Sequence, residues 1–191
     1  GSEAAAPSTA LWLKTLVGCN VSITTTTLYA SLAGLSCGEV SGTAFDVTHS
    51  AITADAGLST TDQSTYGVAF TGVYINSGSR GSLADTTIRS VLMQGVPSGD
   101  QRYSKGVDVY GITESSRLEI TRCDIYTQGN NAENGLSSGI SLSKASSSCL
   151  VVSESRVVAT CCAAVSSLGD ALAGASCSAT KCTKYIYSVD R

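Results

Sequence analysis

The sequence of 191 residues is poor in charge, proline and long apolar runs. Asp, Glu, Lys and Arg make up 14% of it, against about 25% in an average globular protein. The net charge is −3 and Lys and Arg form no cluster, which argues against a nucleic-acid partner because phosphate binding needs grouped basic residues. No apolar stretch approaches the ~20 residues of a membrane-spanning helix. We therefore expect neither nucleic-acid binding nor membrane insertion.

Metal ligands are also scarce, since the chain has one histidine and no Cys-x-x-Cys pair. A zinc site of the usual spacing is not indicated, and we expect no metal and no other cofactor. The eight cysteines are an even number, which favours disulfides in an extracellular or cell-surface protein. The alternative is that they are small buried residues in a reduced core. The candidate disulfide cysteines are Cys149, Cys161, Cys162, Cys177 and Cys182.

Val, Ile and Thr occur in short bursts bounded by Gly and Ser, which is typical of β-strands rather than helices. Within these bursts a short string recurs: an apolar residue, then Ser or Cys three places later, then another apolar residue two places later. Its clearest copy spans residues 118–125. The small residue is at position 19, 50, 90, 123 and 155, with gaps of 31, 40, 33 and 32 residues. The largest gap predicts an inserted loop at residues 55–66.

A second string begins with Gly and alternates apolar residues with a period of two. Its copies start at Gly72, Gly106 and Gly139, with a looser copy at Gly42. Period-two alternation predicts strands, whereas helical repeats need amphipathic helices and a propeller blade needs about 40 residues. We therefore predict an all-β protein, a right-handed parallel β-helix of about five coils.

The two strings resemble those of the right-handed parallel β-helix (pectate-lyase-like) superfamily, in its non-catalytic Ser/Gly-rich form from bacterial surface proteins and phage tail fibres. The resemblance covers the coils at residues 11–160. Residues 1–10 are expected as a lead-in whose first two residues resemble a cloning remnant, and residues 161–191 as a C-terminal cap. The resemblance to fibre tips leaves a homotrimer open, with the Leu11-Trp12-Leu13 segment either capping the coils or meeting its symmetry mates.

Stacked coils place equivalent residues about 4.8 Å apart. The small residues at 19, 50, 90, 123 and 155 should then form one inward ladder, and Ile52, Leu92, Ile125 and Val157 an aliphatic one. The outward ladder beside them would be His49, Arg89, Arg122 and Glu154, in which Arg122 and Glu154 pair.

Enzymes of the superfamily cut acidic polysaccharides, and hydrolysis needs two carboxylates about 5 to 9.5 Å apart. The outward position of the second string has one acid, Asp108, where an enzyme would have a stack. His49 lacks the sequence context of a catalytic triad. The sequence therefore favours a protein that is not an enzyme, although a polysaccharide lyase or glycoside hydrolase stays an alternative, as does a structural spacer.

Tyrosine is the abundant aromatic residue, with eight copies against two Phe and one Trp. It offers a flat apolar face and a hydroxyl at low entropic cost, which suits sugar stacking and protein contacts; ordinary strand aromatics are the alternative. We expect an exported recognition or adhesion module, at the tip of a surface fibre, that binds a glycan or a cell-surface protein. The candidate ligand-binding residues are Tyr66, Tyr74, Tyr103, Tyr110, Tyr126, Asp108 and Arg122.

Overall fold

The computed structural model describes residues 6–58, 63–92, 102–129, 135–160, 176–180 and 183–187. At 58, 71–73, 135–136, 176–180 and 183–187 only the backbone is described. Apart from one short 3-10 helix, η1 (Ala56–Leu58), the elements in this part of the chain are all β-strands. None of the described helical structure is long and apolar enough to span a bilayer.

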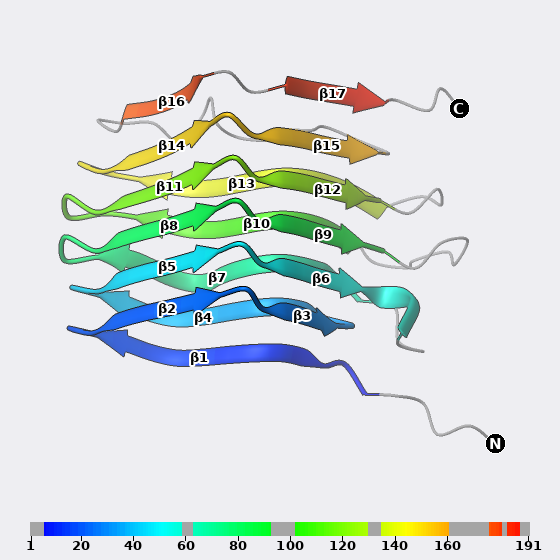
Figure 1. The fold of residues 1–191 in the computed structure, drawn as a ribbon, viewed down its shortest axis with the longest axis horizontal. Helices are drawn as coiled ribbons and strands as arrows, with labels where there is room; N and C mark the ends of the chain where they lie inside the picture. Colours follow the sequence, from blue (N-terminus) through cyan, green and yellow to red (C-terminus); the bar gives the residue numbers. More distant parts are fainter. Residues whose placement is uncertain are drawn as a thin grey trace.

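All strands pair in parallel and belong to three sheets (Figure 1). The first sheet consists of β1 (Thr9–Val17), β4 (Ala33–Ser41), β7 (Thr65–Asn76), β10 (Arg102–Ile112) and β13 (Gly135–Ala145). The second consists of β2 (Asn20–Thr24), β5 (Ala44–Thr48), β8 (Arg80–Ala84), β11 (Arg117–Thr121), β14 (Cys149–Ser153) and β16 (Ser176–Thr180). The third consists of β3 (Thr27–Ala30), β6 (Ala51–Asp55), β9 (Thr87–Val91), β12 (Asp124–Gln128), β15 (Arg156–Thr160) and β17 (Thr183–Tyr187).

Three consecutive strands, one in each sheet, make one coil, so that β1–β3 form the first coil and β13–β15 the fifth. Figure 1 shows these coils stacked, with the N-terminus at one end of the stack and the C-terminus at the other. The prediction of an all-β protein with parallel strands is confirmed, and the arrangement is consistent with a β-helix-like fold. Strands β16 and β17 extend the second and third sheets by parallel pairing with β14 and β15. The assignment of residues 161–191 as a cap stays a prediction.

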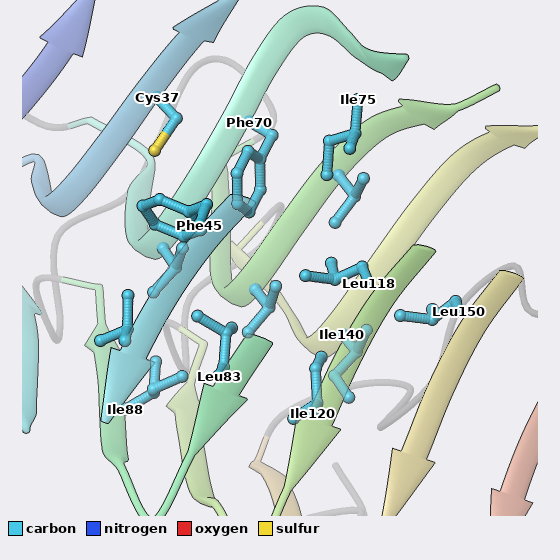
Figure 2. Close-up of a cluster of buried hydrophobic side chains, with 14 of the residues drawn as sticks. Cys37, Phe45, Phe70, Ile75, Leu83, Ile88, Leu118, Ile120, Ile140 and Leu150 are labelled. Carbon is cyan, nitrogen blue, oxygen red and sulfur yellow. The ribbon is translucent and has the colours of Figure 1, made fainter. Parts of the chain in front are cut away.

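The core lies between the three sheets and consists of stacked aliphatic and aromatic side chains (Figure 2). Ile52, Ile88, Ile125 and Val157 are aligned on successive strands of the third sheet and are buried. The predicted ladder was therefore right at three positions and wrong at Leu92, because the register of β6 with β9 places Ile88 beside Ile52.

A row of glycines on the first sheet faces this isoleucine row. Registers align Gly34, Gly67, Gly106 and Gly139 on β4, β7, β10 and β13. A Cβ on Gly34, Gly67 or Gly106 would overlap Cγ2 of Ile52, Ile88 or Ile125 respectively. The predicted copies at Gly42 and Gly72 were therefore wrong. On β7 the row position is taken by Gly67, while Gly72 lies further along the strand, in a bulge between Phe70 and Tyr74 where β7 has two more residues than β10.

The corner between the second and third sheets repeats one backbone conformation on every coil. Its first residue has a φ between 50° and 52°, a backbone conformation that residues other than glycine rarely adopt. These first residues are Thr25, His49, Asp85, Arg122 and Glu154. The next residue is small and points inward, and this corner ladder consists of Thr26, Ser50, Thr86, Cys123 and Ser155.

The members of the corner ladder share one pattern of hydrogen bonds. The side chain of each donates to the carbonyl two residues earlier, as from Ser50 Oγ to Thr48 O at 2.8 Å. The N–H of each of the first four donates to the ladder side chain of the next coil, as from Cys123 N to Ser155 Oγ at 3.1 Å. The predicted ladder was thus right at 50, 123 and 155 and wrong at 19 and 90. Cys19 lies at the other corner, where its Sγ is 3.8 Å from Thr43 Oγ1.

Ser90 lies inside β9 instead, where it donates to Thr65 Oγ1 at 2.9 Å and accepts a bond from Ser104 Oγ at 3.0 Å. The coil lengths vary because the connection from the third sheet back to the first varies. Corner positions are 24 residues apart from Thr26 to Ser50 and 36 residues apart from Ser50 to Thr86. The inserted loop predicted at residues 55–66 coincides with the connection between β6 and β7.

Candidate ligand-binding face

The side chains of Tyr74, Tyr110 and Lys144 meet on the outer face of the first sheet, opposite the face that packs into the core. Tyr74, Gly111 and Lys144 are aligned on β7, β10 and β13. A Cβ on Gly111 would overlap the ring of Tyr74, so the tyrosine packs flat against the β10 backbone. The missing side chain at Gly111 therefore fixes the position of the Tyr74 ring.

Tyr110 and Lys144 complete this group, which we call the tyrosine–lysine cluster. The rings of Tyr74 and Tyr110 are edge to face, with centroids 5.3 Å apart and planes at 71°, a favoured aromatic geometry. Lys144 Nζ lies 5.6 Å from the Tyr110 ring centroid. Its hydrogen bond to the Tyr74 hydroxyl, together with the electrostatic influence of both tyrosines, raises the pKa of Lys144 above its usual value. The cluster therefore holds a positive charge at neutral pH beside the Tyr110 ring and the Tyr74 hydroxyl.

A second group lies further toward the start of β10 on the same sheet. Lys105 Nζ is 2.8 Å from Asp108 Oδ1 and 5.3 Å from the ring centroid of Tyr103. Tyr66 is the register partner of Lys105 on β7. Asp108 lies between the core residues Val107 and Val109, as expected of an outward position, but it is only 7% exposed. Its charge is balanced by Lys105 and it is not available as an isolated acid.

Tyr126 lies apart from these groups on the third sheet. Its ring is stacked under Arg89, with 5.3 Å between Arg89 Cζ and the ring centroid, and its hydroxyl donates to Gln128 Oε1 at 3.1 Å. Arg89 and Tyr126 are register partners on β9 and β12. The structure therefore places four predicted tyrosines on the first sheet and removes Tyr126 from that set.

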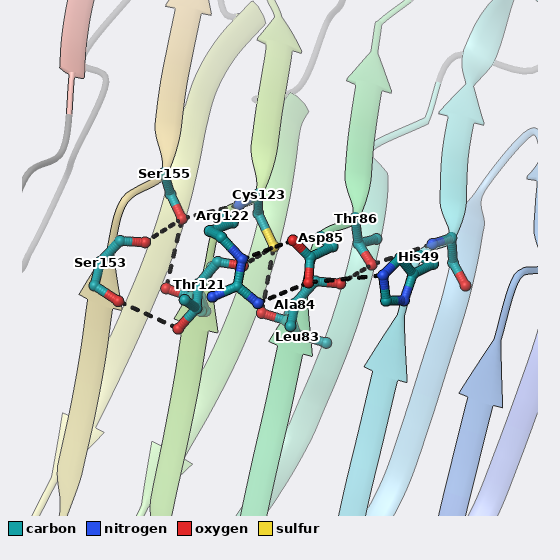
Figure 3. Close-up of polar contacts among 12 residues, drawn as sticks. His49, Leu83, Ala84, Asp85, Thr86, Thr121, Arg122, Cys123, Ser153 and Ser155 are labelled. Carbon is teal, nitrogen blue, oxygen red and sulfur yellow. Dashed lines mark hydrogen bonds and ion pairs between the residues drawn. The ribbon is translucent and has the colours of Figure 1, made fainter.

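Arg122 lies at the corner between the second and third sheets, where Asp85 occupies the equivalent position one coil earlier (Figure 3). Arg122 Nε and Nη2 each donate to one oxygen of Asp85 at 2.7 Å, a bidentate geometry. His49 Nε2 lies 4.0 Å from Asp85 Oδ2. The expected outer row was therefore wrong at Arg89, whose place Asp85 takes, and Arg122 forms its ion pair with Asp85 instead of Glu154.

The hydrogen bonds from Arg122 lower the pKa of the Asp85 carboxyl, and the same pair raises the pKa of Arg122. Both side chains are solvent-exposed to a large degree, so this pair is a surface feature of the corner. Arg122 is thus engaged by its own chain, which weakens its case as a ligand-binding residue.

Carboxylates do not stack on neighbouring coils in the part of the chain that the structure describes. Asp46 and Glu119 are in one row of the second sheet, but Ser82 lies between them. The same residues contain no group of three or more His, Cys, Asp or Glu side chains arranged to hold a metal ion. The arrangement of described acids therefore offers no pair of the kind that hydrolysis on adjacent coils would use.

The described cysteines Cys19, Cys37, Cys123 and Cys149 have free thiols. Burial raises the pKa of Cys37 to about 12. Cys161, Cys162 and Cys182 lie outside the described residues, and of Cys177 only the backbone is described. A disulfide among the four C-terminal cysteines stays a prediction, while Cys149 has no disulfide partner in the structure.

Lys144 and Gly111 are site residues that sequence reasoning missed. Both follow the period, because Lys144 comes 33 residues after Gly111 and is its register partner. An alignment of the chain on that period would have found them.

Comparison with models of known protein families, with curated proteins and with solved structures finds no match for this chain.

Proposed function

We propose that the chain is a right-handed parallel β-helix of the pectate-lyase-like kind, exported to the cell surface or beyond, that recognises a glycan without catalysing a reaction. The binding site in this proposal is the outer face of the first sheet. The observation that supports it most directly is the tyrosine–lysine cluster of Tyr74, Tyr110 and Lys144.

The cluster has the chemistry that sugar recognition needs. Tyrosine rings present apolar faces for stacking and hydroxyls for hydrogen bonds. The Lys144 ammonium adds a positively charged donor beside them. All three residues are on strands, with Tyr74 and Tyr110 beside the bulge of β7, and sites on strands hold their geometry better than sites on loops.

The second group extends the same face. Gly111 follows Asp108 by three residues, which is about 10 Å along an extended strand. Tyr66, Tyr103 and Lys105 therefore lie within reach of a ligand that begins at the tyrosine–lysine cluster and runs along β10. Because Lys105 is paired with Asp108 and Lys144 is not paired with an acid among its described contacts, the proposal favours glycans with carboxylate groups.

A glycan-array screen followed by calorimetry tests this proposal. Tyr74→Ala and Tyr110→Ala should each weaken binding of the best array ligand at least about tenfold, which corresponds to the ~1.4 kcal/mol of one lost aromatic contact. Tyr126→Ala is the matched control, because it removes a tyrosine from the third sheet, and it should leave affinity unchanged.

Two results would contradict the proposal. One is the absence of binding to any glycan, and the other is equal loss of affinity in all three variants. Incubation of the protein with uronic-acid polymers, followed by an assay for new chain ends, tests the enzymatic alternative, and release of products would favour it.

A further inference from the structure

The large apolar side chains that are exposed gather on the first coil. Trp12 is 65% exposed, Val17 57% and Tyr29 56%. Trp12 and Val17 belong to β1 and Tyr29 to β3. Elsewhere among the described residues no side chain of this kind is exposed. The first coil therefore differs from the four coils stacked after it.

The core below the first coil is open at this end. Leu11, Leu13, Val21 and Leu28 point toward the core but are only partly buried. Their register partners one coil later, Leu35, Cys37, Phe45 and Ile52, are almost completely buried. Because β1, β2 and β3 are the terminal strands of their sheets, each also has one edge that pairs with no other strand among the described residues.

Residues 6–32, which form this end of the stack, contain little of the usual protection of strand edges. Proteins protect such edges with charged side chains, prolines inside the strand or bulges. Between residues 6 and 32 the sequence has one charged side chain, Lys14, and its proline, Pro7, precedes β1. We call the open edges of β1–β3 together with these apolar side chains the N-terminal face.

We propose that the N-terminal face is an interface with a second copy of this chain, related by a two-fold axis. A partner must present three strand edges around an open core to pair with all three edges at once, and the same face of another copy has that outline. A two-fold axis through the middle of β1 sets β1 antiparallel to β1 of the second copy. It also sets β2 against β3 of the second copy, which differs from it in length by one residue. Such an interface is self-complementary.

The side chains on β1 fit this arrangement in one register. With Leu13 on the axis, Trp12 lies directly opposite Lys14 of the second copy, on the outer face, and the symmetry repeats the contact. Residues directly opposite in an antiparallel pair are close enough to interact, and a lysine beside an indole forms a cation–π contact. Leu13 meets its own symmetry mate on the inner face and closes the core.

Sedimentation velocity over a range of concentrations tests the proposal. The wild-type chain should form a reversible dimer. Trp12 is the one tryptophan in the sequence, so its emission should shift to shorter wavelength as the dimer forms. Trp12→Lys sets like charges opposite each other and should raise the dissociation constant at least about tenfold.

The double variant Trp12→Lys/Lys14→Glu should restore the dimer, because it places opposite charges across the axis. The matched control is Thr87→Lys, which adds the same charge at an exposed position on β9 and should leave the dimer intact. Circular dichroism confirms that each variant retains its strands.

A wild-type chain that stays monomeric at every concentration would overturn the proposal, as would a trimer. A monomer whose β1 amides resist hydrogen exchange would also overturn it, because another part of the chain would then cover the face. A double variant that stays monomeric while the wild type dimerises contradicts the register, and with it the proposed pairing.

Discussion

Ile88 fits against the backbone of β7 because Gly67 has no side chain there. A Cβ on Gly67 would overlap Cγ2 of Ile88 and lie 2.6 Å from the carbonyl oxygen of Gly106. Ile88 belongs to the third sheet and Gly67 to the first, so this contact sets how closely the two sheets approach. The same relationship repeats in the neighbouring coils.

Gly67→Ala should therefore destabilise the fold, since neither the Ile88 side chain nor the Gly106 carbonyl can move away without disturbing a sheet. Overpacking of a core typically costs about 1–3 kcal/mol, and we expect a loss in this range in urea-induced unfolding. Gly57→Ala is the control, because its Cβ would meet the flexible carboxylate of Asp55 at 3.1 Å. Equal stability of the two variants would contradict the packing argument.

Cys123 takes the place of a hydroxyl residue in the corner ladder, where its thiol donates to Thr121 O at 3.5 Å and accepts from the Thr86 N–H. Cys123→Ser should keep both bonds and leave the free energy of unfolding nearly unchanged. Cys123→Val should lose about 1–3 kcal/mol, because it leaves the buried Thr86 N–H unsatisfied. Chemical denaturation of the two variants measures the difference, and a valine variant as stable as the serine variant would argue against a structural ladder.

Gly111→Ala tests the proposed site without removing any tyrosine. The added methyl group would displace the Tyr74 ring from β10, so affinity for the glycan should fall nearly as far as in Tyr74→Ala. Calorimetry measures the affinity, and thermal unfolding shows whether the sheet is retained. Full affinity in a folded Gly111→Ala variant would show that the position of Tyr74 is unimportant for binding.

The pair of Asp85 and Arg122 predicts a pH dependence. Arg122 lowers the pKa of Asp85 below 3.8, so the pair contributes stability above that pH and loses it as the pH falls through the lowered pKa. Arg122→Gln should raise the pKa of Asp85 toward 3.8, as measured by NMR titration of the carboxyl carbon. Arg80→Gln, at the other end of β8, should leave that titration unchanged. A midpoint unaffected by Arg122→Gln would exclude the pair in solution.

Burial at Cys37 predicts slow thiol chemistry. A pKa of about 12 leaves almost no thiolate near pH 8. Cys37 should therefore resist iodoacetamide in the native protein and react fully in denaturant, while the partly exposed Cys19 and Cys149 should react before it. Mass spectrometry of the alkylated peptides identifies the order, and early labelling of Cys37 would contradict the described core.

The sequence predicted the strands and their parallel stacking because inward aliphatic residues alternate with polar ones and recur with each coil. It failed at Cys19 and Ser90 because the two corners and the strand interiors all accept small hydroxyl or thiol side chains. Because the coils differ in length by 12 residues, the sequence period could not show that Cys19 and Ser90 belong to other rows than Ser50.

Asp85 was missed for a different reason. Its corner position is defined by a positive φ, and the five coils fill it with Thr, His, Asp, Arg and Glu. Such a position has a fixed backbone and no preferred chemistry, so no sequence pattern marks it. Of the tyrosine–lysine cluster, the sequence predicted the two tyrosines and missed Lys144. Gly111 was also missed, because its role depends on a contact with Tyr74 on the neighbouring strand.

The repeated corner geometry has a consequence for the size of the molecule. The second, third and fourth coils share the glycine–isoleucine fit and the corner hydrogen bonds, so these coils are nearly interchangeable units. Joining the end of β9 to the start of β13 would set Gly67 beside Gly139 and Thr86 beside Ser155, the same pairings one step shorter. Removal of the fourth coil would thus shorten the stack by one strand spacing, about 4.8 Å, and would leave the first coil unchanged.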